Sequence, residues 1–522
     1  MSTFASAGGS AAKHQGQYIL AIDQGTTSSR AMIYNTKLRA QGRGQSEFPQ
    51  YFPANGQVEH DPSDILETTL LACRKAIKDA GIQVTDIAVI GITNQRETTV
   101  VWDKASGKPI YRAIVWQDRR TAAHCQTLRE QGCEALVQER TGLLLDPYFS
   151  ATKIAWILDH VKGARQKAEA GELAFGTIDS FLLWHLSGGQ VHATDATNAS
   201  RTLLMNLHTR EWDSELCETF GVPSEMLPEI KDNASAFGVA NPDLFREGAS
   251  IRFSPQNADK HETAGIPIGA MIGDQQGALV GQACIEPGQI KSTYGTGCFA
   301  LVNTGDKPVK SEHRLLSTLG YQIDGKPTYA LEGSIFMAGA IVQWLRDKLG
   351  IIQTAAETEQ LAEGIDCEQS EILIPAFTGL GAPYWDPNAR AAIFGMTRDT
   401  GKKQLAAAAL RSVALQTRDL LQAMVADGQT IDMIKVDGGM TDNGWFMQAL
   451  ADITGHSVVR ADTAEISVRG AAFLAGLEVG LFNSFNELTK LCGSKGTFTP
   501  ESSKADRQHL HKRWLAAIAK VR

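Results

Sequence analysis

The chain has 522 residues, too many for one hydrophobic core, and this length indicates two to four domains. Apolar residues make up 43% and charged residues 21% of the chain, which is typical of a soluble globular protein and excludes global disorder. A formal net charge of -8 argues against a nucleic acid or an anionic membrane surface as a partner, because either would require a basic face.

Residues 1–16 are small and polar and contain no apolar run of the length found in a signal peptide. We therefore expect a disordered tail there. No apolar run approaches the roughly 18 residues of a membrane-spanning helix, so we expect a soluble, cytoplasmic protein. The 8 cysteines form no C-x-x-C pair, which predicts reduced thiols and neither a zinc site nor a redox motif.

The first predicted element is a β-hairpin. Residues 18–22 form a short apolar run typical of a strand buried on both faces, 23–29 form a polar turn, and 31–34 resume the apolar pattern. The same plan returns half a chain later, where a strand beginning at Ile290 leads into the turn 294–297 and a second strand leaves it. Two small-residue hairpins at this separation suggest a duplicated nucleotide-binding unit, although they share little beyond Gly and Thr.

Helices and further strands alternate with these hairpins, which predicts an α/β fold. Strands are predicted at 87–92, 266–272 and 434–436. Residues 401–426 carry an apolar stripe at helical spacing, and 334–349 predict another helix with Gly339 inside it. A glycine in a helix costs about 1 kcal/mol relative to alanine, so Gly339 indicates either close helix packing or room for a ligand.

Three glycine-containing motifs could hold a nucleotide. No Gly-Lys is followed by Ser or Thr, so a Walker A loop is excluded. The turns 23–28 and 294–297 present backbone N–H groups and hydroxyls without bulky side chains, although either alone is more often an ordinary hairpin turn. A strand ending in Asp437-Gly438-Gly439 could hold a purine against glycine backbone.

These three motifs, in this order, resemble the actin-like ATPase superfamily, and residues 148–156 resemble the signature of its carbohydrate-kinase branch. Longer blocks are similar to the glycerol kinase family; they lie at 92–99, 115–117, 146–150, 273–276 and 376–385. The resemblance implies two actin-like ATPase domains of duplicated topology with an interdomain catalytic cleft. It implies an N-terminal domain at 17–280 for substrate and phosphate and a C-terminal domain at 281–522 for the adenine nucleotide.

The resemblance also implies an activity, the transfer of the γ-phosphate of ATP to glycerol with Asp274 as the general base. A neutral triol needs charged hydrogen-bond partners in fixed positions and an apolar wall. The residues that match the family's substrate site are Arg96, Glu97, Trp116, Tyr148, Asp274, Gln275 and Phe299. Without the resemblance, Asp274 would be interpreted as a helix N-cap, Arg96 and Glu97 as a surface pair, and the aromatic residues as core.

The nucleotide side follows from the same resemblance. The residues expected on the phosphates are Thr26, Thr27, Ser28, Arg30 and Thr296, and those expected around the adenosine are Gly339, Gln343, Gly439 and Asn443. Asp23 is expected to hold Mg²⁺ through water, because this ion keeps part of its hydration shell. Asp437 is expected to lie behind the glycines that follow it.

One segment departs from the family pattern. Some bacterial members carry a Gly-Gly-x-Arg loop that binds fructose 1,6-bisphosphate and promotes tetramer formation. Here residues 252–262 differ in composition and Gly265 stands where the arginine is expected, so we do not expect this regulation. The family still implies a homodimer or homotetramer.

Two alternatives stay open from the sequence. One is a kinase of the same family that acts on a ketose or another polyol. The other is an actin-like or chaperone-like ATPase module, which would hydrolyse ATP with water and would have no use for the polar and aromatic residues of the substrate site.

Overall fold

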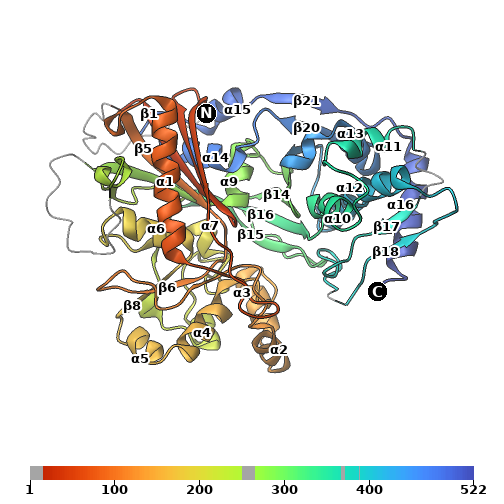
Figure 1. Cartoon of the computed structure of the whole chain (residues 1–522). Coiled ribbons are helices and arrows are strands. Elements are labelled where there is room, and N and C mark those ends of the chain that lie inside the picture. Colours follow the sequence, from red (N-terminus) through yellow and green to blue (C-terminus); the bar gives the residue numbers. More distant parts are fainter. Residues whose placement is uncertain (1–15, 250–264, 366–370, 387) are drawn as a thin grey trace.

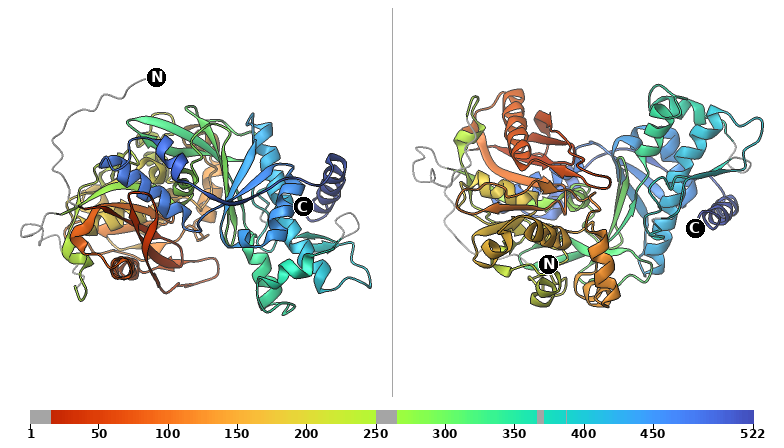
Figure 2. Two further views of the ribbon diagram at one scale, coloured as in Figure 1. Left: turned by 90° about the horizontal axis from the view of Figure 1, so that it is seen from above. Right: turned by 60° about the horizontal axis from the view of Figure 1, so that its bottom comes forward.

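The computed structural model describes residues 16–249, 265–365, 371–386 and 388–522. Two large β-sheets, one from each half of the chain, form its framework (Figures 1 and 2). Nearly all of the expected tail and the whole of segment 252–262 lie outside the described residues, so both predictions about them stay predictions.

The first sheet has the strand order β11-β12-β5-β1-β2-β3. Its central strand β1 is buried on both faces, as predicted, because alternate side chains enter different cores. Leu20 and Ile22 pack in the cluster that includes helix α1, whereas Ile19 and Ala21 pack in the cluster that includes helix α14. The strands are β1 (Tyr18–Gln24), β2 (Ser28–Asn35), β3 (Ala40–Glu47), β5 (Ile87–Asn94), β11 (Val239–Ala240) and β12 (Ile266–Gly273).

The second sheet has the strand order β15-β16-β14-β13-β19-β20-β21. The long helix α12 packs on it, with Val413 and Leu420 in the same cluster as Ile290 and Val302. The strands are β13 (Ile290–Tyr294), β14 (Cys298–Gly305), β15 (Leu316–Ile323), β16 (Lys326–Ile335), β19 (Met433–Asp437), β20 (Ser457–Ala461) and β21 (Ser494–Phe498).

The two sheets repeat one topology. In the first, β1 pairs antiparallel with β2, β2 with β3, and β1 runs parallel to β5, which runs parallel to β12. In the second, β13, β14, β16, β19 and β20 take the same places with the same directions. The predicted pair of hairpins is therefore the start of two equivalent units.

Helices α9 (Asp274–Gly281) and α14 (Ile466–Glu478) join the two halves. Helix α14 comes late in the chain, yet it covers the first sheet, where a Cβ on Gly91 would lie 2.4 Å from the carbonyl oxygen of Ala471. Glycines also let α9 and α14 approach each other, since a Cβ on Gly470 would lie 2.1 Å from the carbonyl oxygen of Gly277. Larger residues at these positions would separate the helices.

The predicted long helix is confirmed as α12 (Lys402–Ala426), but the predicted helix 334–349 is wrong at its start. Ser334 and Ile335 end strand β16, where they pair with Phe299 and Cys298 of β14, and helix α10 begins only at Gly339. The glycine therefore begins the helix instead of interrupting it. Pairing with a distant strand decided the outcome, and a local pattern cannot show this.

Smaller elements surround the two sheets. Among the described residues, no helix is long and apolar enough to cross a membrane. The further helices are α1 (Pro62–Ala80), α2 (Ala122–Glu130), α3 (Glu134–Thr141), α4 (Ser150–His160), α5 (Ala164–Glu169), α6 (Ile178–Leu186), α7 (Ala196–Ala199), α8 (Ser214–Phe220), α10 (Gly339–Asp347), α11 (Glu357–Ala362), α13 (Gly444–Thr454), α15 (Phe485–Leu491) and α16 (Lys504–Ile518). The short strands are β4 (Glu59–His60), β6 (Val100–Asp103), β7 (Ala113–Ile114), β8 (Leu173–Gly176), β9 (Ala193–Asp195), β10 (Glu229–Lys231), β17 (Ile372–Ile374) and β18 (Ala392–Phe394).

Candidate active site

Asp274 lies where strand β12 ends and helix α9 begins. The N-cap of this helix is Gly273, so Asp274 is the first helical residue and does not take the N-cap position. Its Oδ1 accepts a hydrogen bond from the backbone N–H of Gln275 at 2.7 Å. The carboxylate side chain keeps 31% exposure, which leaves it accessible to a ligand.

Arg96 and Glu97 follow strand β5 and are buried, so the alternative of a surface ion pair is wrong. Arg96 is 3% exposed, and its Nε lies 3.1 Å from Oδ1 of Asp274. Glu97 has a φ of 61°, an unusual conformation for a residue with a side chain. Its carbonyl oxygen accepts hydrogen bonds from Ser150 Oγ at 3.1 Å and Lys153 Nζ at 3.3 Å, both from helix α4. The segment that resembles the carbohydrate-kinase signature thus holds Glu97 in place.

Three aromatic side chains form one wall beside these charges. The ring of Trp116 lies 5.7 Å from that of Tyr148 and 6.3 Å from that of Phe299, both edge to face. The guanidinium of Arg96 lies 6.0 Å from the centre of the Phe299 ring. All three rings are half-buried, so each keeps a face that a small molecule can contact.

A buried ion network that the sequence did not predict holds this cluster. Glu332 of β16 accepts from Arg96 Nη1 at 2.5 Å and from Arg201 Nη2 at 3.0 Å, and Arg201 Nε donates to Glu97 at 2.7 Å. Burial alone would raise the pKa of Glu332, but Arg201 and Arg96 lower this pKa to about 2. Two guanidinium groups and two carboxylates therefore compensate one another in a site without water contact.

The first phosphate-type turn joins β1 and β2. It is closed by a hydrogen bond from Gly25 N to Ser28 O of 3.0 Å, and Thr26 Oγ1 accepts from Trp116 Nε1 at 3.0 Å. The turn therefore touches the aromatic wall. Thr27 is exposed at its tip.

Two charged side chains stand at the base of this turn. Arg30 Nη1 lies 2.5 Å from Glu465 and 3.6 Å from Asp23, so its charge is already paired. Burial raises the pKa of Asp23 to about 6; Arg30 opposes this change, and the nearby carboxylates of Asp274 and Glu465 add to it. A carboxylate held among other carboxylates is a site that a hard divalent cation would stabilise. In the described residues, no group of three or more His, Cys, Asp or Glu side chains forms a complete cage for a metal.

The second turn lies between β13 and β14, against the start of α10. Thr296 is exposed, and its carbonyl oxygen accepts from the N–H groups of Ala338 and Ala340, each at 3.0 Å. A Cβ on Gly339 would lie 2.7 Å from the carbonyl oxygen of Gly295, so close backbone packing explains this glycine. Gln343 projects from the exposed face of the same helix.

The Asp-Gly-Gly motif (residues 437–439) lies against the second turn. Gly438 has a φ of +95°, and a Cβ there would lie 2.4 Å from the carbonyl oxygen of Tyr294. Gly439 is exposed with no atom within 4 Å of a Cβ position, which leaves open space beside it. Asn443 caps helix α13 by accepting from Phe446 N at 2.8 Å. Asp437, which precedes the two glycines, is buried and accepts a hydrogen bond from Gln282 Nε2.

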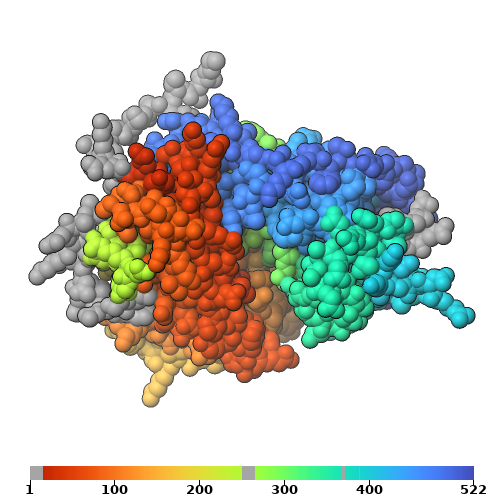
Figure 3. Space-filling view, turned by 45° about the horizontal axis from the view of Figure 1, so that its top comes forward, coloured from red at the N-terminus to blue at the C-terminus, as the bar shows by residue number. Residues whose placement is uncertain are grey.

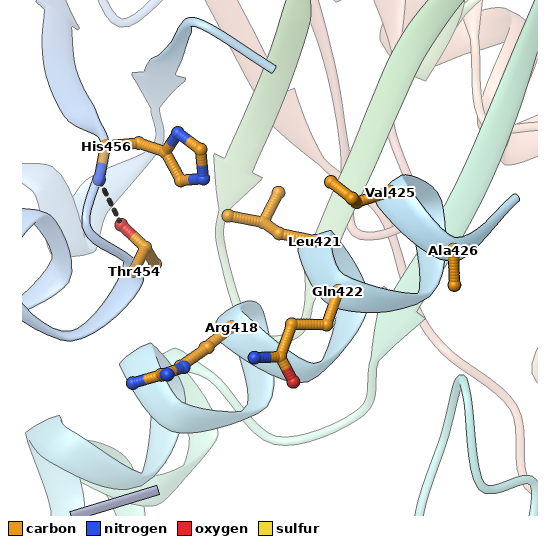
Figure 4. A pocket seen from close by; sticks show the side chains of 7 residues that line it. All are labelled: Arg418, Leu421, Gln422, Val425, Ala426, Thr454 and His456. Atoms are coloured by element: carbon orange, nitrogen blue, oxygen red, sulfur yellow. Dashed lines mark hydrogen bonds between the residues drawn. The ribbon is translucent and has the colours of Figure 1, made fainter. Parts of the chain in front are cut away.

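Figure 3 shows an indentation of the surface between residues of the first sheet and residues near α10 and α11. A different hollow, of about 310 Å³, lies on the second half and is lined by Arg418, Leu421, Gln422, Val425, Ala426, Thr454 and His456 (Figure 4). None of the predicted site residues lines it. Arg418 is engaged there with the carbonyl oxygens of Ile453 and Arg507 at 3.2 and 2.6 Å, so its charge stabilises helix packing.

Residues 18–281 match the N-terminal domain of the FGGY family of carbohydrate kinases, and residues 290–479 match its C-terminal domain. The chain belongs to the FGGY family of carbohydrate kinases. The predicted α/β architecture of two actin-like units is confirmed with it, whereas the exact domain boundary stays a prediction.

The sequences and structures of individual relatives align with nearly the whole length of this FGGY kinase. It is 55% identical over 507 residues to the glycerol kinase of Ectopseudomonas mendocina, covering 97% of this chain and 99% of the relative. It is 54% identical over 508 residues to the glycerol kinase of Bradyrhizobium diazoefficiens, covering 97% and 98%. The crystal structure of Plasmodium falciparum glycerol kinase with ADP superposes with a TM-score of 0.88 at 35% identity, covering 97% and 98%. A xylulose kinase from Lactobacillus acidophilus has a TM-score of 0.84 at 20% identity over 96% and 98%, a likeness that shows the fold alone.

The structure brings together the seven residues expected at the substrate site of this FGGY kinase. Those expected on the nucleotide gather at the two turns and the Asp-Gly-Gly motif, although their roles stay predictions. Sequence reasoning missed Arg201, Lys291 and Glu332. A signal existed for Glu332, which is a single charge in the largely apolar run 329–335.

Proposed function

We propose that this kinase transfers the γ-phosphate of ATP to glycerol, giving sn-glycerol 3-phosphate and ADP. The observation that carries the proposal is the contact between Arg96 Nε and Asp274 at 3.1 Å, beside the wall formed by Trp116, Tyr148 and Phe299. Fixed charged partners next to an apolar wall suit a short neutral polyol. The high identity to proteins named glycerol kinase supports the same substrate.

Asp274 is the general base of the proposed reaction. It accepts the proton of a terminal hydroxyl while that oxygen forms a bond to the γ-phosphorus. The bond from this phosphorus to the bridging oxygen breaks, and its electron pair leaves with ADP. Proton transfer of this kind contributes roughly 10²–10⁴-fold, and positioning by Arg96 and Gln275 adds to it.

The two glycine-containing turns bind the phosphates from opposite sides. The hydroxyls and N–H groups of Thr26, Thr27 and Ser28 stand on one side and those of Thr296 on the other, as donors that need no rearrangement. Arg30 reduces the negative charge, although Glu465 shares its guanidinium. The open backbone at Gly439, with Gly339, Gln343 and Asn443, receives the adenosine.

Asp23 would hold Mg²⁺, which would neutralise part of the negative charge of the phosphates. The carboxylate fits this ion because burial raises its pKa, the negative charges of Asp274 and Glu465 add to this effect, and a cation would offset both. A homodimer or homotetramer in the cytoplasm remains part of the proposal and rests on the family resemblance alone.

The test is ADP release in a coupled assay with glycerol, dihydroxyacetone, erythritol and xylulose, each with and without Mg²⁺. We expect the largest kcat/KM with glycerol and no turnover when Mg²⁺ is chelated. A larger kcat/KM with xylulose or erythritol would favour the sister kinase. ADP release at the same rate with and without every polyol would favour the ATPase module. The buried polar cluster around Arg96 already argues against this alternative.

A further inference from the structure

Lys291 is a fully buried lysine that the proposed reaction does not yet use. It lies on strand β13 of the second sheet with 0% exposure. Its Nζ donates to Gln275 Oε1, to Thr293 Oγ1 at 3.1 Å and to the carbonyl oxygen of Phe299 at 3.2 Å. Burial lowers the pKa of Lys291, while Asp437, Asp274 and Glu332 act in the opposite direction. Burying an ammonium group costs free energy unless hydrogen bonds or opposite charges compensate it.

The three contacts account for all three protons of the ammonium group, which can only donate. The atom of Gln275 that faces Lys291 must therefore be the carbonyl oxygen. The amide nitrogen then faces the other way, where its Nε2 lies 3.2 Å from Oδ2 of Asp274, an acceptor. Both neighbours favour the same orientation of the amide, so Gln275 presents N–H groups to the site and no acceptor.

We propose that Lys291 is a positioning residue, which fixes the side-chain amide of Gln275 so that its N–H groups face Asp274 and the substrate hydroxyl beside it. The hydroxyl oxygen then accepts from Gln275 while its proton points to Asp274. This arrangement leaves an oxygen lone pair for attack on the γ-phosphorus. The inference rests on the proposed phosphorylation of a polyol and adds a residue that acts through Gln275.

The neighbouring strand offers a matched control. Lys435 of β19 pairs in register with Lys291, but its Nζ reaches the opposite end of helix α9, the carbonyl oxygens of Gln282 and Ala283 at 2.9 and 3.0 Å. Lys435 thus supports the C-terminal end of the helix, whereas Lys291 contacts a side chain of the site. Lys291 is buried and Lys435 is half-buried, and both lie on the same face of the sheet. Each substitution therefore removes one ammonium group from that face.

The test is a double-mutant cycle with Lys291→Met and Gln275→Leu, measured as kcat and KM for glycerol and for ATP. We expect each single variant to lower kcat/KM for glycerol about 10–100-fold, the scale of a charge-assisted hydrogen bond, with the ATP KM nearly unchanged. The double variant should lose no more than about twofold beyond Gln275→Leu, because the lysine acts through the glutamine. Lys435→Met should retain wild-type kcat/KM.

Multiplied losses in the double variant would overturn the proposal, because Lys291 would then act independently of Gln275. A second variant, Gln275→Glu, keeps the contact to Lys291 as an ion pair but has no N–H group. The kcat/KM of Gln275→Glu for glycerol should therefore be as low as that of Gln275→Leu. This comparison can be made even if Lys291→Met does not fold, and wild-type turnover of Gln275→Glu would also overturn the proposal. If wild-type protein does not phosphorylate glycerol, the proposed substrate is wrong, and the same cycle on the accepted polyol still tests Lys291.

Discussion

Glu332 and Arg96 are 236 positions apart in the chain, yet two hydrogen bonds join their side chains, one of 2.5 Å and one of 3.2 Å. Glu332 belongs to the second sheet and Arg96 follows a strand of the first, so this fork-to-fork contact connects the two halves at the substrate site. It is bidentate and fully buried, which gives it a defined geometry. The orientation of Arg96 toward Asp274 therefore depends on the second half of the chain.

Removal of this carboxylate should destabilise the protein. Glu332→Ala leaves Arg96 and Arg201 without their shared partner, and breaking a buried ion pair costs about 3–5 kcal/mol. Denaturant unfolding of the wild type and the variant measures the loss. The exposed pair of Lys78 and Glu247 serves as a control, since Lys78→Ala should change stability little. Equal effects of both substitutions would contradict the importance assigned to the buried network.

Replacement of the proposed base should lower the rate of phosphoryl transfer without weakening the binding of ATP. Asp274→Asn keeps the size of the side chain but cannot accept a proton, so kcat should fall by about 10² or more. Because Asp274 is not the N-cap of α9, the thermal unfolding midpoint and the ATP affinity should stay close to those of the wild type. Wild-type turnover in this variant would show that another group accepts the proton.

The sequence predicted those parts of the site that lie in continuous blocks. The turn near Thr26, the Arg96–Glu97 pair and Asp274 are all marked by several neighbouring residues, and the structure brings them together. Glu332 and Arg201 stand outside these blocks, and their roles come from contacts between residues far apart in the chain, those of Glu332 with Arg96 and Arg201 and that of Arg201 with Glu97. The long-range pairing of β16 with β14 placed Ser334 in a strand where helical spacing had predicted a helix.

The geometry of the Arg96 guanidinium should matter more than its charge. Arg96→Lys keeps a positive charge but cannot contact Glu332 in a fork and Asp274 through Nε at the same time. We expect the glycerol KM to rise about 10–100-fold and the ATP KM to stay nearly constant. Arg120→Lys is the matched control, because Arg120 is a buried arginine that pairs with Glu59 and Asp118 instead of with Glu332 and Asp274. A loss of ATP affinity with unchanged glycerol affinity would place Arg96 on the phosphate side.

His60 should make the protein sensitive to acid. Its ring is fully buried, and this burial lowers its pKa to about 4 from an ordinary value of 6.5. Between these two pH values the unfolded chain binds a proton that the folded chain does not, so stability must fall as the pH decreases through this interval. A difference of this size between the folded and unfolded pKa corresponds to roughly 3 kcal/mol.

The variant His60→Gln should therefore show a flatter decline in stability between pH 6.5 and 4 than the wild type. Glutamine can keep a hydrogen bond to Gln50, whose Oε1 lies 2.6 Å from Nε2 of His60, and it has no proton to bind in this range. Denaturant unfolding at several pH values, without nucleotide or polyol, measures the difference. His124→Gln, at an exposed position, should leave the pH dependence unchanged. Parallel curves for His60→Gln and the wild type would show that His60 accepts a proton inside the folded protein, which would require Gln95, whose Nε2 faces Nδ1 of His60 at 3.4 Å, to rearrange.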